Sequence, residues 1–206
     1  MGKHFWEIPD PPAAGDTSND VTFHAVGAAL SQWEYFEGNL SLTFSYLIGT
    51  GFRNIASMRA YGSVENFRGR HNMIENAAEV YFRYNPDKQA YQELKSLLKL
   101  AMNHLSGRRN EIAHGIVQPY FVLEAPGSIR RIQKGYVLYP AIYAARKYDI
   151  PDAPPMTETT ITPKYIYSSS EIHHFGAQFQ NLANRAINVL TALAHHEQRQ
   201  AAARRR

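Results

Sequence analysis

The chain has 206 residues, of which 44% are apolar, carries a formal net charge of +4 and contains no cysteine. This length and apolar content are enough to bury the core of one domain. The lack of cysteine excludes disulfides, thiolate catalysis and any zinc site built on Cys ligands. The mild basic charge favours polyanionic partners only slightly, because many unrelated proteins share it.

The chain also lacks the signals of several large functional classes. Residues 1–9 have no apolar signal-peptide core, and no window reaches the roughly 18 uninterrupted apolar residues that a membrane span requires. Walker loops, dinucleotide fingerprints and Gly-x-Ser-x-Gly elbows are absent from the sequence, which leaves nucleotide hydrolysis, redox and serine-hydrolase chemistry without support. We therefore expect a soluble, cytoplasmic protein with no membrane partner.

The first half of the chain is predicted to be mostly helical. Residues 1–19 are rich in Pro, Gly and Asp and should form an extended leader. From Val26, apolar residues recur at helical spacing until Gly49-Thr50-Gly51 ends the helix. A short helix over 54–61 and a longer helix over 63–84 should follow. The stripe of the first helix consists of Val26, Leu30, Trp33, Phe36, Leu40, Phe44 and Leu47.

The next helix should begin near Asn85-Pro86, which can end the preceding helix or supply a cap and first-turn Pro to this one. Gly107 either kinks this helix or breaks it in two. Extending its apolar phase across Gly107 places Arg109 on or beside the buried face, where a charge needs a partner or a water-filled cleft. The apolar stripe consists of Leu94, Leu98, Ala101, Leu105, Ile112 and Ile116.

A small β insertion over 117–167 is predicted after this helix. Residues 117–123 and 129–139 are rich in Val, Ile and Tyr and flank a Pro126-Gly127 turn signal, which predicts a hairpin. A surface loop over 149–163 and a short strand over 164–167 should complete the insertion.

One more long helix is expected at the end of the domain. Ser168 with Glu171 has the spacing of a capping box, which marks the start of a helix. The domain should therefore cover residues 20–197, followed by a basic tail over 198–206. The apolar stripe of this helix consists of Ile172, Phe175, Phe179, Leu182, Ala186, Val189 and Leu193.

The centre of the chain holds the residues best suited to chemistry, within Gly107-Arg-Arg-Asn-Glu-Ile-Ala-His-Gly115. The Arg109 guanidinium can bind phosphate oxygens in a bidentate way. Five residues later, the His114 imidazole can transfer protons near neutral pH. Neither group needs a metal ion, so this pair with Asn110 between them is typical of metal-independent phosphate chemistry.

The pattern Arg109-Asn110-x-x-x-His114 resembles the Arg-Asn-His signature of HEPN domains, which are helical bundles, many of them metal-independent endoribonucleases. The likeness covers roughly residues 20–116 and 168–197. It implies a mainly α-helical HEPN-like bundle of four to five helices with a small β insertion between the motif helix and the last helix.

The resemblance also implies a function. Family members commonly form two-fold dimers whose motifs meet at one cleft, and catalytic members cut RNA by attack of the ribose 2′-hydroxyl on the adjacent phosphate. Arg109 would then hold the phosphate, His114 would transfer protons, Asn110 would orient the helix or the scissile backbone, and Arg108 would contact RNA. No cofactor or metal is expected. A toxin-like or defence role, with an antitoxin or inhibitor protein as a further partner, rests on the same resemblance.

Several alternatives stay open. The chain could be a non-catalytic HEPN-type dimeric module that binds RNA or a protein partner. His114 followed by Gly115 could be an ordinary helix end, with the glycine in the left-handed conformation. Arg109 could simply pair with Glu111, Glu75 or Glu79.

Other residues carry weaker hypotheses. The pairs His173-His174 and His195-His196 are neighbours on a helix and point different ways, which is poor geometry for a shared metal ion. Aromatic residues of the insertion could either stack on bases, with Arg130, Arg131 and Lys134 nearby, or pack its strands. These aromatic residues are Tyr120, Tyr136, Tyr139, Tyr143 and Tyr148.

Overall fold

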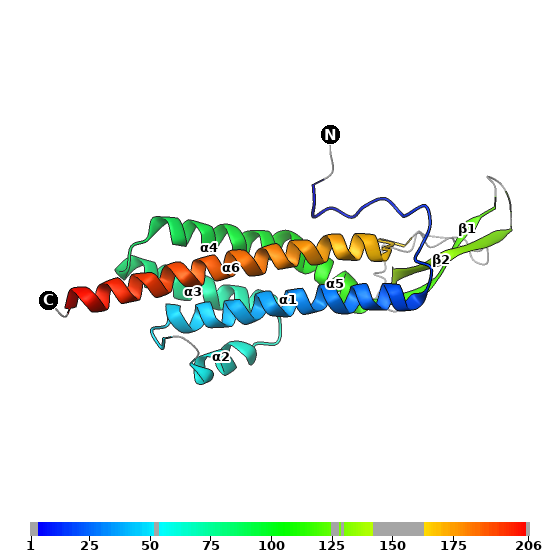
Figure 1. Cartoon of the computed structure of the whole chain (residues 1–206). Helices are drawn as coiled ribbons and strands as arrows, with labels where there is room; N and C mark the ends of the chain where they lie inside the picture. The colour runs from blue at the N-terminus through cyan, green and yellow to red at the C-terminus, as the bar shows by residue number, and fades with distance from the viewer. Residues whose placement is uncertain (1–3, 52–53, 125–127, 129, 142–162, 205–206) are drawn as a thin grey trace, which may run out of the picture. The chain divides into compact units, whose positions relative to one another are not determined.

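Helices make up most of the structure, a computed structural model that describes residues 4–51, 54–124, 128, 130–141 and 163–204 (Figure 1). The one described sheet is an antiparallel pair of strands. The expected mainly α-helical fold with a small β insertion is therefore confirmed. In chain order the elements are α1 (Asn19–Leu47), α2 (Ile55–Gly62), α3 (Phe67–Tyr84), α4 (Lys88–Leu100), the π-helical turn η1 (Ala101–Leu105), α5 (Ser106–His114), β1 (Gly115–Leu123), β2 (Arg131–Pro140) and α6 (Ser169–Arg204).

The chain divides into two compact units. The first comprises Met1–Leu30 and Arg108–Gly176, and the second comprises Ser31–Gly107 and Ala177–Arg206. Both long helices, α1 and α6, supply residues to each unit. The motif residues from Arg108 onward belong to the first unit. No helix of the described ranges combines the length and the apolar character that crossing a membrane requires.

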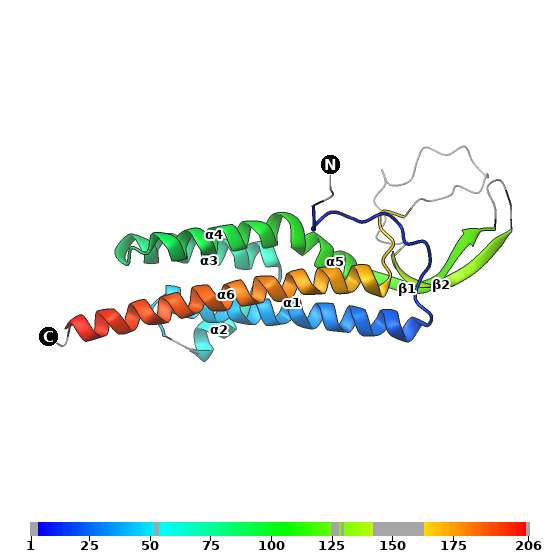
Figure 2. The ribbon, with the colours of Figure 1, turned by 45° about the horizontal axis from the view of Figure 1, so that its top comes forward.

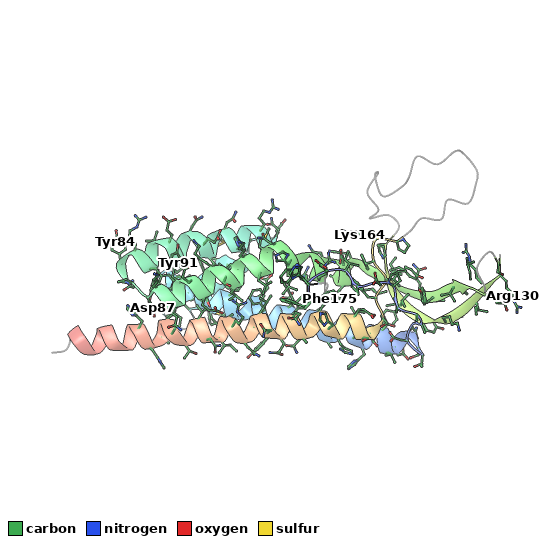
Figure 3. The ribbon with its side chains drawn as sticks, turned by 90° about the horizontal axis from the view of Figure 1, so that it is seen from above. Tyr84, Asp87, Tyr91, Arg130, Lys164 and Phe175 are labelled. Atoms are coloured by element: carbon green, nitrogen blue, oxygen red, sulfur yellow. The ribbon has the colours of Figure 1, made fainter. Side chains whose placement is uncertain are left out.

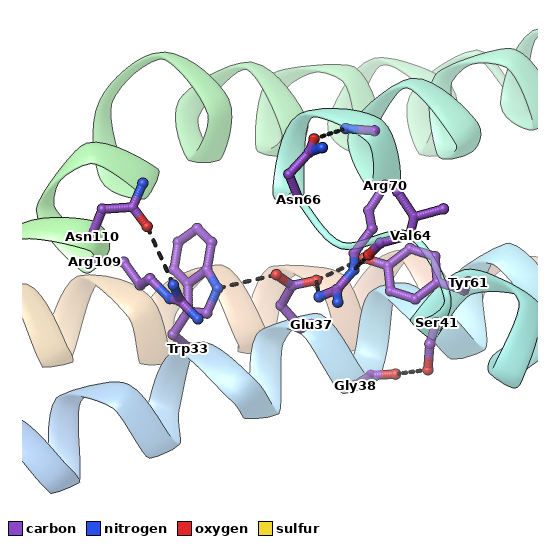
Figure 4. A network of polar contacts seen from close by, with 11 residues as sticks. Trp33, Glu37, Gly38, Ser41, Tyr61, Val64, Asn66, Arg70, Arg109 and Asn110 are labelled. Atoms are coloured by element: carbon purple, nitrogen blue, oxygen red, sulfur yellow. Dashed lines mark hydrogen bonds and ion pairs between the residues drawn. The ribbon is translucent and has the colours of Figure 1, made fainter. Parts of the chain in front are cut away.

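The second unit is held together by aromatic packing and one buried carboxylate. Trp33 lies edge-on to Phe36 and Phe179, with ring centroids 5.4 and 5.3 Å apart. Buried Glu37 accepts hydrogen bonds from Trp33 Nε1 (3.2 Å), Tyr61 Oη (3.0 Å) and Arg70 NH1 (3.0 Å) (Figure 4). Since the carboxylate has both a cation and neutral donors, its burial is compensated.

Local capping determines the helix boundaries in the second unit. The chain leaves α1 through Gly49, whose φ of +75° suits a residue without a Cβ. The expected short helix forms as α2, and the Asn54 side chain caps it by accepting from Ser57 N. The helix predicted from residue 63 begins at Phe67, because the Asn66 side chain caps it. Asp87, not Asn85, caps α4.

In the first unit, the leader is attached through Asp16. The Asp16 carboxylate accepts hydrogen bonds from Thr22 Oγ1 (2.6 Å), Ser169 N (2.9 Å) and Ser169 Oγ (2.6 Å). Its backbone forms a β-bridge with Tyr136 of β2. Gly135, with φ +108°, permits this approach, because a Cβ there would lie 2.4 Å from the Asp16 carbonyl oxygen. The leader is thus held by a carboxylate and a strand-like bridge, together with a hydrogen bond from His174 Nε2 to the Phe5 carbonyl oxygen at its start.

The predicted hairpin is confirmed as β1 and β2, which pair from Gly115 with Pro140 to Leu123 with Arg131. Tyr120, Val137 and Ile166 form its small core. The expected strand over 164–167 is reduced to one bridge between Tyr167 and Leu138. The Pro126-Gly127 turn and nearly all of the predicted 149–163 loop lie outside the described residues.

The start of α6 confirms the predicted capping box. Ser168 N donates to Glu171 Oε2 at 2.7 Å, and Ser170 N donates to Ser168 Oγ at 3.3 Å. Every residue of the predicted apolar stripe, from Ile172 to Leu193, is buried. The helix continues to Arg204, through most of the segment expected to be a basic tail.

Candidate functional site

The candidate site is α5, a regular α-helix that runs directly into β1 (Figure 2). Buried Leu105 and Ile112 are seven residues apart and so lie on one face. Arg108 and Arg109 both fall between them at helical spacing, and both have a buried Nε atom. The apolar periodicity of the sequence predicted Arg109 on or beside this face, and the structure shows that Arg108 lies there as well. Both are partly buried.

Arg108 is engaged in an ion pair with Glu111. Its NH2 atom lies 3.0 Å from Glu111 Oε1, and the two side chains are only 13% and 10% exposed. Arg108 NH1 also donates to the Tyr167 hydroxyl at 3.4 Å. The RNA contact expected of Arg108 therefore conflicts with its role here, because its guanidinium is committed to Glu111 and Tyr167.

Glu111 is the centre of a polar cluster that ties α5 to the segment before α6. Tyr167 Oη donates to Glu111 Oε2 at 2.7 Å, and Lys164 Nζ lies 3.5 Å from Glu111 Oε1. Tyr165 Oη donates to the Glu111 backbone carbonyl at 2.8 Å. The two tyrosine rings stack with centroids 4.8 Å apart. These contacts thus hold the motif helix in place at Glu111, directly after Asn110.

Both tyrosines of this cluster are held in the neutral form. Burial, and then the charge of the Glu111 carboxylate, raises the pKa of Tyr165 and of Tyr167 above the ordinary value of a phenol. For Tyr167 the hydrogen bond to Glu111 acts in the same direction. A protonated phenol can donate to a carboxylate, whereas a phenolate beside it would be repelled.

Arg109 lies beside the buried face of α5, and Asn110 lies on the exposed side. Arg109 NH1 donates to Asn110 Oδ1 at 3.2 Å (Figure 4). Asn110 is exposed and Arg109 is half-buried. Glu111 pairs with Arg108, Glu75 with His71 and Glu79 with Arg83. The hydrogen bond to Asn110 orients the NH1 side of the Arg109 guanidinium.

His114 is the last residue of α5 and is exposed. Within the described part of the chain, the ring accepts and donates no hydrogen bond. Gly115 does not adopt the left-handed conformation expected of an ordinary helix end, since its φ is not positive. Instead, a Cβ at Gly115 would lie 2.6 Å from Leu138 Cγ and 3.0 Å from the Glu111 carbonyl oxygen. The glycine is required by close packing against β2.

Regular helix geometry separates the directions of Arg109 and His114. At about 100° per residue, side chains five positions apart diverge by roughly 140° around the axis. Gly107 lies inside α5 and does not break it. The irregularity is instead η1, which lies before the motif and so leaves the angle between Arg109 and His114 unchanged. One α5 helix therefore does not aim both groups at one point.

Sequence reasoning missed the Glu111 cluster. A Glu three residues after an Arg was the available signal, because these positions adjoin on a helix. Nothing in the sequence indicated that Tyr165 and Tyr167 reach the backbone carbonyl and the carboxylate of Glu111 from more than fifty residues away. Of the insertion's tyrosines, Tyr120 is buried and donates to the Pro12 carbonyl at 3.0 Å, which is a packing role. Tyr143 and Tyr148 lie outside the described residues.

Metal ligands were not expected from the sequence. In the described ranges, no three His, Asp or Glu side chains are grouped so that they could hold a metal ion.

Comparisons of the chain with protein-family models, with curated proteins and with solved structures found no match. The functional argument therefore depends on the motif residues and their surroundings.

Proposed function

We propose that this chain is a HEPN-type, metal-independent endoribonuclease that acts as a homodimer. The observation that carries the proposal is the exposed His114 ring at the end of the helix that also presents the Arg109 guanidinium. By family resemblance, the protein acts on cellular RNA as a toxin or defence factor under the control of an inhibitor protein.

The proposed reaction uses the chain's own side chains. His114 takes the proton from a ribose 2′-hydroxyl, and the 2′ oxygen attacks the adjacent phosphorus. The bond to the 5′ oxygen breaks, and that oxygen takes a proton from water and leaves as a 5′-hydroxyl. A positioned acid or base contributes about 10² to 10⁴ in rate to each such step. The products are a 2′,3′-cyclic phosphate and a 5′-hydroxyl.

Arg109 supplies the electrostatic part of the proposal. Negative charge grows on the non-bridging phosphate oxygens during the attack, and a preoriented donor stabilises it. Asn110 orients this guanidinium by accepting its hydrogen bond at 3.2 Å. The Glu111 cluster keeps α5 in place while the guanidinium contacts phosphate.

The dimer follows from the direction of the two side chains. Since Arg109 and His114 of one α5 diverge by roughly 140°, a second copy is the arrangement we propose for bringing both groups to one phosphate. A two-fold axis beside α5 can place the Arg109 of one protomer opposite the His114 of its partner.

The first prediction concerns cleavage by the purified full chain. We expect it to cut single-stranded RNA in the presence of EDTA and to leave 2′,3′-cyclic phosphate ends. His114→Ala and Arg109→Ala should each lower the rate by at least about 100-fold, since each removes a group that acts in the transition state. Gel analysis of end-labelled RNA measures the rate, and circular dichroism checks the helical fold.

Matched controls come from residues of the same kind elsewhere. His173 and Arg68 are exposed on other helices, so His173→Ala and Arg68→Ala should cut like the parent. Cleavage that survives in both motif variants would refute the proposal. If no variant or parent cuts RNA while Arg109→Ala dissociates a dimer, the chain is instead a non-catalytic dimeric module.

A further inference from the structure

The β-hairpin has one face that its core does not cover. Directly paired residues of an antiparallel sheet point to the same side, and Phe121 pairs with Gln133 while Leu123 pairs with Arg131. We call these four residues the outer face of the hairpin. Phe121 is 51% exposed and Leu123 is 53% exposed. The alternate residue Tyr120 is instead buried in the hairpin core.

An exposed cation lies beside the apolar residues of the outer face. Arg131 is exposed and belongs to that face, whereas Lys134, next to Gln133 on β2, points to the opposite side. Arg130, just before β2, is 73% exposed and pairs with Glu124 at 3.2 Å near the end of the hairpin distant from α5 (Figure 3). Among the described residues of the hairpin, Arg130 is matched by Glu124, and Arg131 adds positive charge on the face of the exposed Phe121 ring.

We propose that the outer face of the hairpin binds single-stranded RNA by stacking a base on Phe121 and pairing a phosphate with Arg131. The choice of RNA depends on the proposed ribonuclease function. An exposed aromatic ring flanked by cations is the combination by which proteins bind unpaired bases without sequence preference. The stacking group is Phe121, not the tyrosines that the sequence emphasised.

Chain connectivity links this surface to the motif. β1 begins at Gly115, directly after His114. At about 3.3 Å per residue, Phe121 lies roughly 20 Å along the strand from Gly115. An RNA strand bound to both places has to extend over several nucleotides, so very short RNAs should be poor substrates.

Binding is measured separately from cleavage. The full-length His114→Ala protein is titrated into a fluorescently labelled oligouridine of about 12 nucleotides, within the usual range of single-strand sites, and followed by anisotropy. Adding Phe121→Ala should weaken binding by about tenfold, because stacking is worth several-fold to 100-fold in affinity per base. Phe121→Trp should retain affinity and Phe121→Leu should lose it. Arg131→Gln should lower the salt dependence by about 0.7 in the log–log slope.

Phe23 provides the matched control, since it is a phenylalanine with 53% exposure on α1. Phe23→Ala should bind like the parent. The inference fails if Phe121→Ala binds as tightly as Phe23→Ala, if Phe121→Leu keeps full affinity, or if duplex RNA binds as well as the single strand. Cleavage by the protein with intact His114 tests the ribonuclease function independently. If the protein cuts RNA but Phe121 variants bind RNA like the parent, only the docking surface is refuted. If binding depends on Phe121 but the protein never cuts RNA, only the catalysis is refuted.

Discussion

At the scale of single residues, Glu111 does more for the motif helix than any other described side chain of α5. Its carboxylate pairs with Arg108 and Lys164 and accepts a hydrogen bond from the Tyr167 hydroxyl. Its backbone carbonyl accepts a hydrogen bond from the Tyr165 hydroxyl. Removing one partner of a nearly buried ion pair leaves the other charge without compensation. The cluster therefore makes the position of α5 depend on distant tyrosines.

Tyr167→Phe tests this cluster without removing a charge. The variant should lose about 1.5 to 3 kcal/mol of unfolding free energy at neutral pH, the usual worth of a hydrogen bond to a charged group. Because the pKa of Tyr167 is raised in the folded protein, the folded state keeps this proton above pH 10 while the unfolded chain releases it. The parent's advantage is thus complete below about pH 10 and declines by about 1.4 kcal/mol per pH unit above it.

Urea unfolding across this pH range measures the difference. Tyr84→Phe is the control, because Tyr84 is 76% exposed. It should match the parent at every pH. A Tyr167→Phe variant as stable as the parent at pH 7 would show that the hydroxyl does not hold α5.

At the scale of elements, the junction between α5 and β1 is the tightest point near the motif. The helix ends at His114 and the strand begins at Gly115 with no connecting residue. Leu138 of β2, which is 1% exposed, closes over this glycine. The position of the imidazole is thereby set by the packing of the hairpin against the end of the helix.

Gly115→Ala should be destabilising by about 1 to 3 kcal/mol, because overpacking a rigid contact forces neighbours to move. The added Cβ would meet Leu138 Cγ at 2.6 Å. Adding Leu138→Ala makes room, so the double variant should be more stable than the sum of the single changes implies. Thermal unfolding of the four proteins gives this coupling.

Gly107→Ala is the control for a glycine in the same helix. In the described part of the chain, no other group lies within 4 Å of the place where its Cβ would be. Alanine should therefore stabilise α5 by about 0.5 to 1 kcal/mol through its helix propensity. Strict additivity of Gly115→Ala with Leu138→Ala would argue against the packing explanation.

At the scale of the whole molecule, the proposed active site requires two chains. Each dimer of the proposed kind has two composite sites, and each site takes Arg109 from one protomer and His114 from the other. In a site built within one chain, both groups would instead come from the same protomer.

Mixing the Arg109→Ala and His114→Ala proteins tests the shared site. A mixed dimer has one site lacking both groups and one site with both intact. After dissociation and reassociation at equal amounts, we expect about a quarter of the parent's cleavage rate, since half the dimers are mixed and half their sites are complete. Rates for each protein alone and for the mixture are compared under identical conditions. A mixture no more active than its components would exclude the shared site.

The sequence by itself determined the helices and much of the motif helix's environment. Apolar periodicity predicted the buried stripe of α6 residue by residue, and the Ser168 and Glu171 spacing predicted its start. These features depend on neighbours within a few residues, which the sequence contains. The same periodicity placed Arg109 beside the buried face of α5.

Only the tertiary structure decided which distant residue binds Arg108 and why Gly115 is a glycine. Arg108 pairs with its neighbour Glu111 but also donates to Tyr167, which comes from a segment far along the chain, and Gly115 is small because Leu138 packs on it. The exposure of Phe121 was decided in the same way, by the register that turns Tyr120 into the hairpin core. Such contacts join residues distant in sequence, and no local pattern of spacing or propensity encodes them.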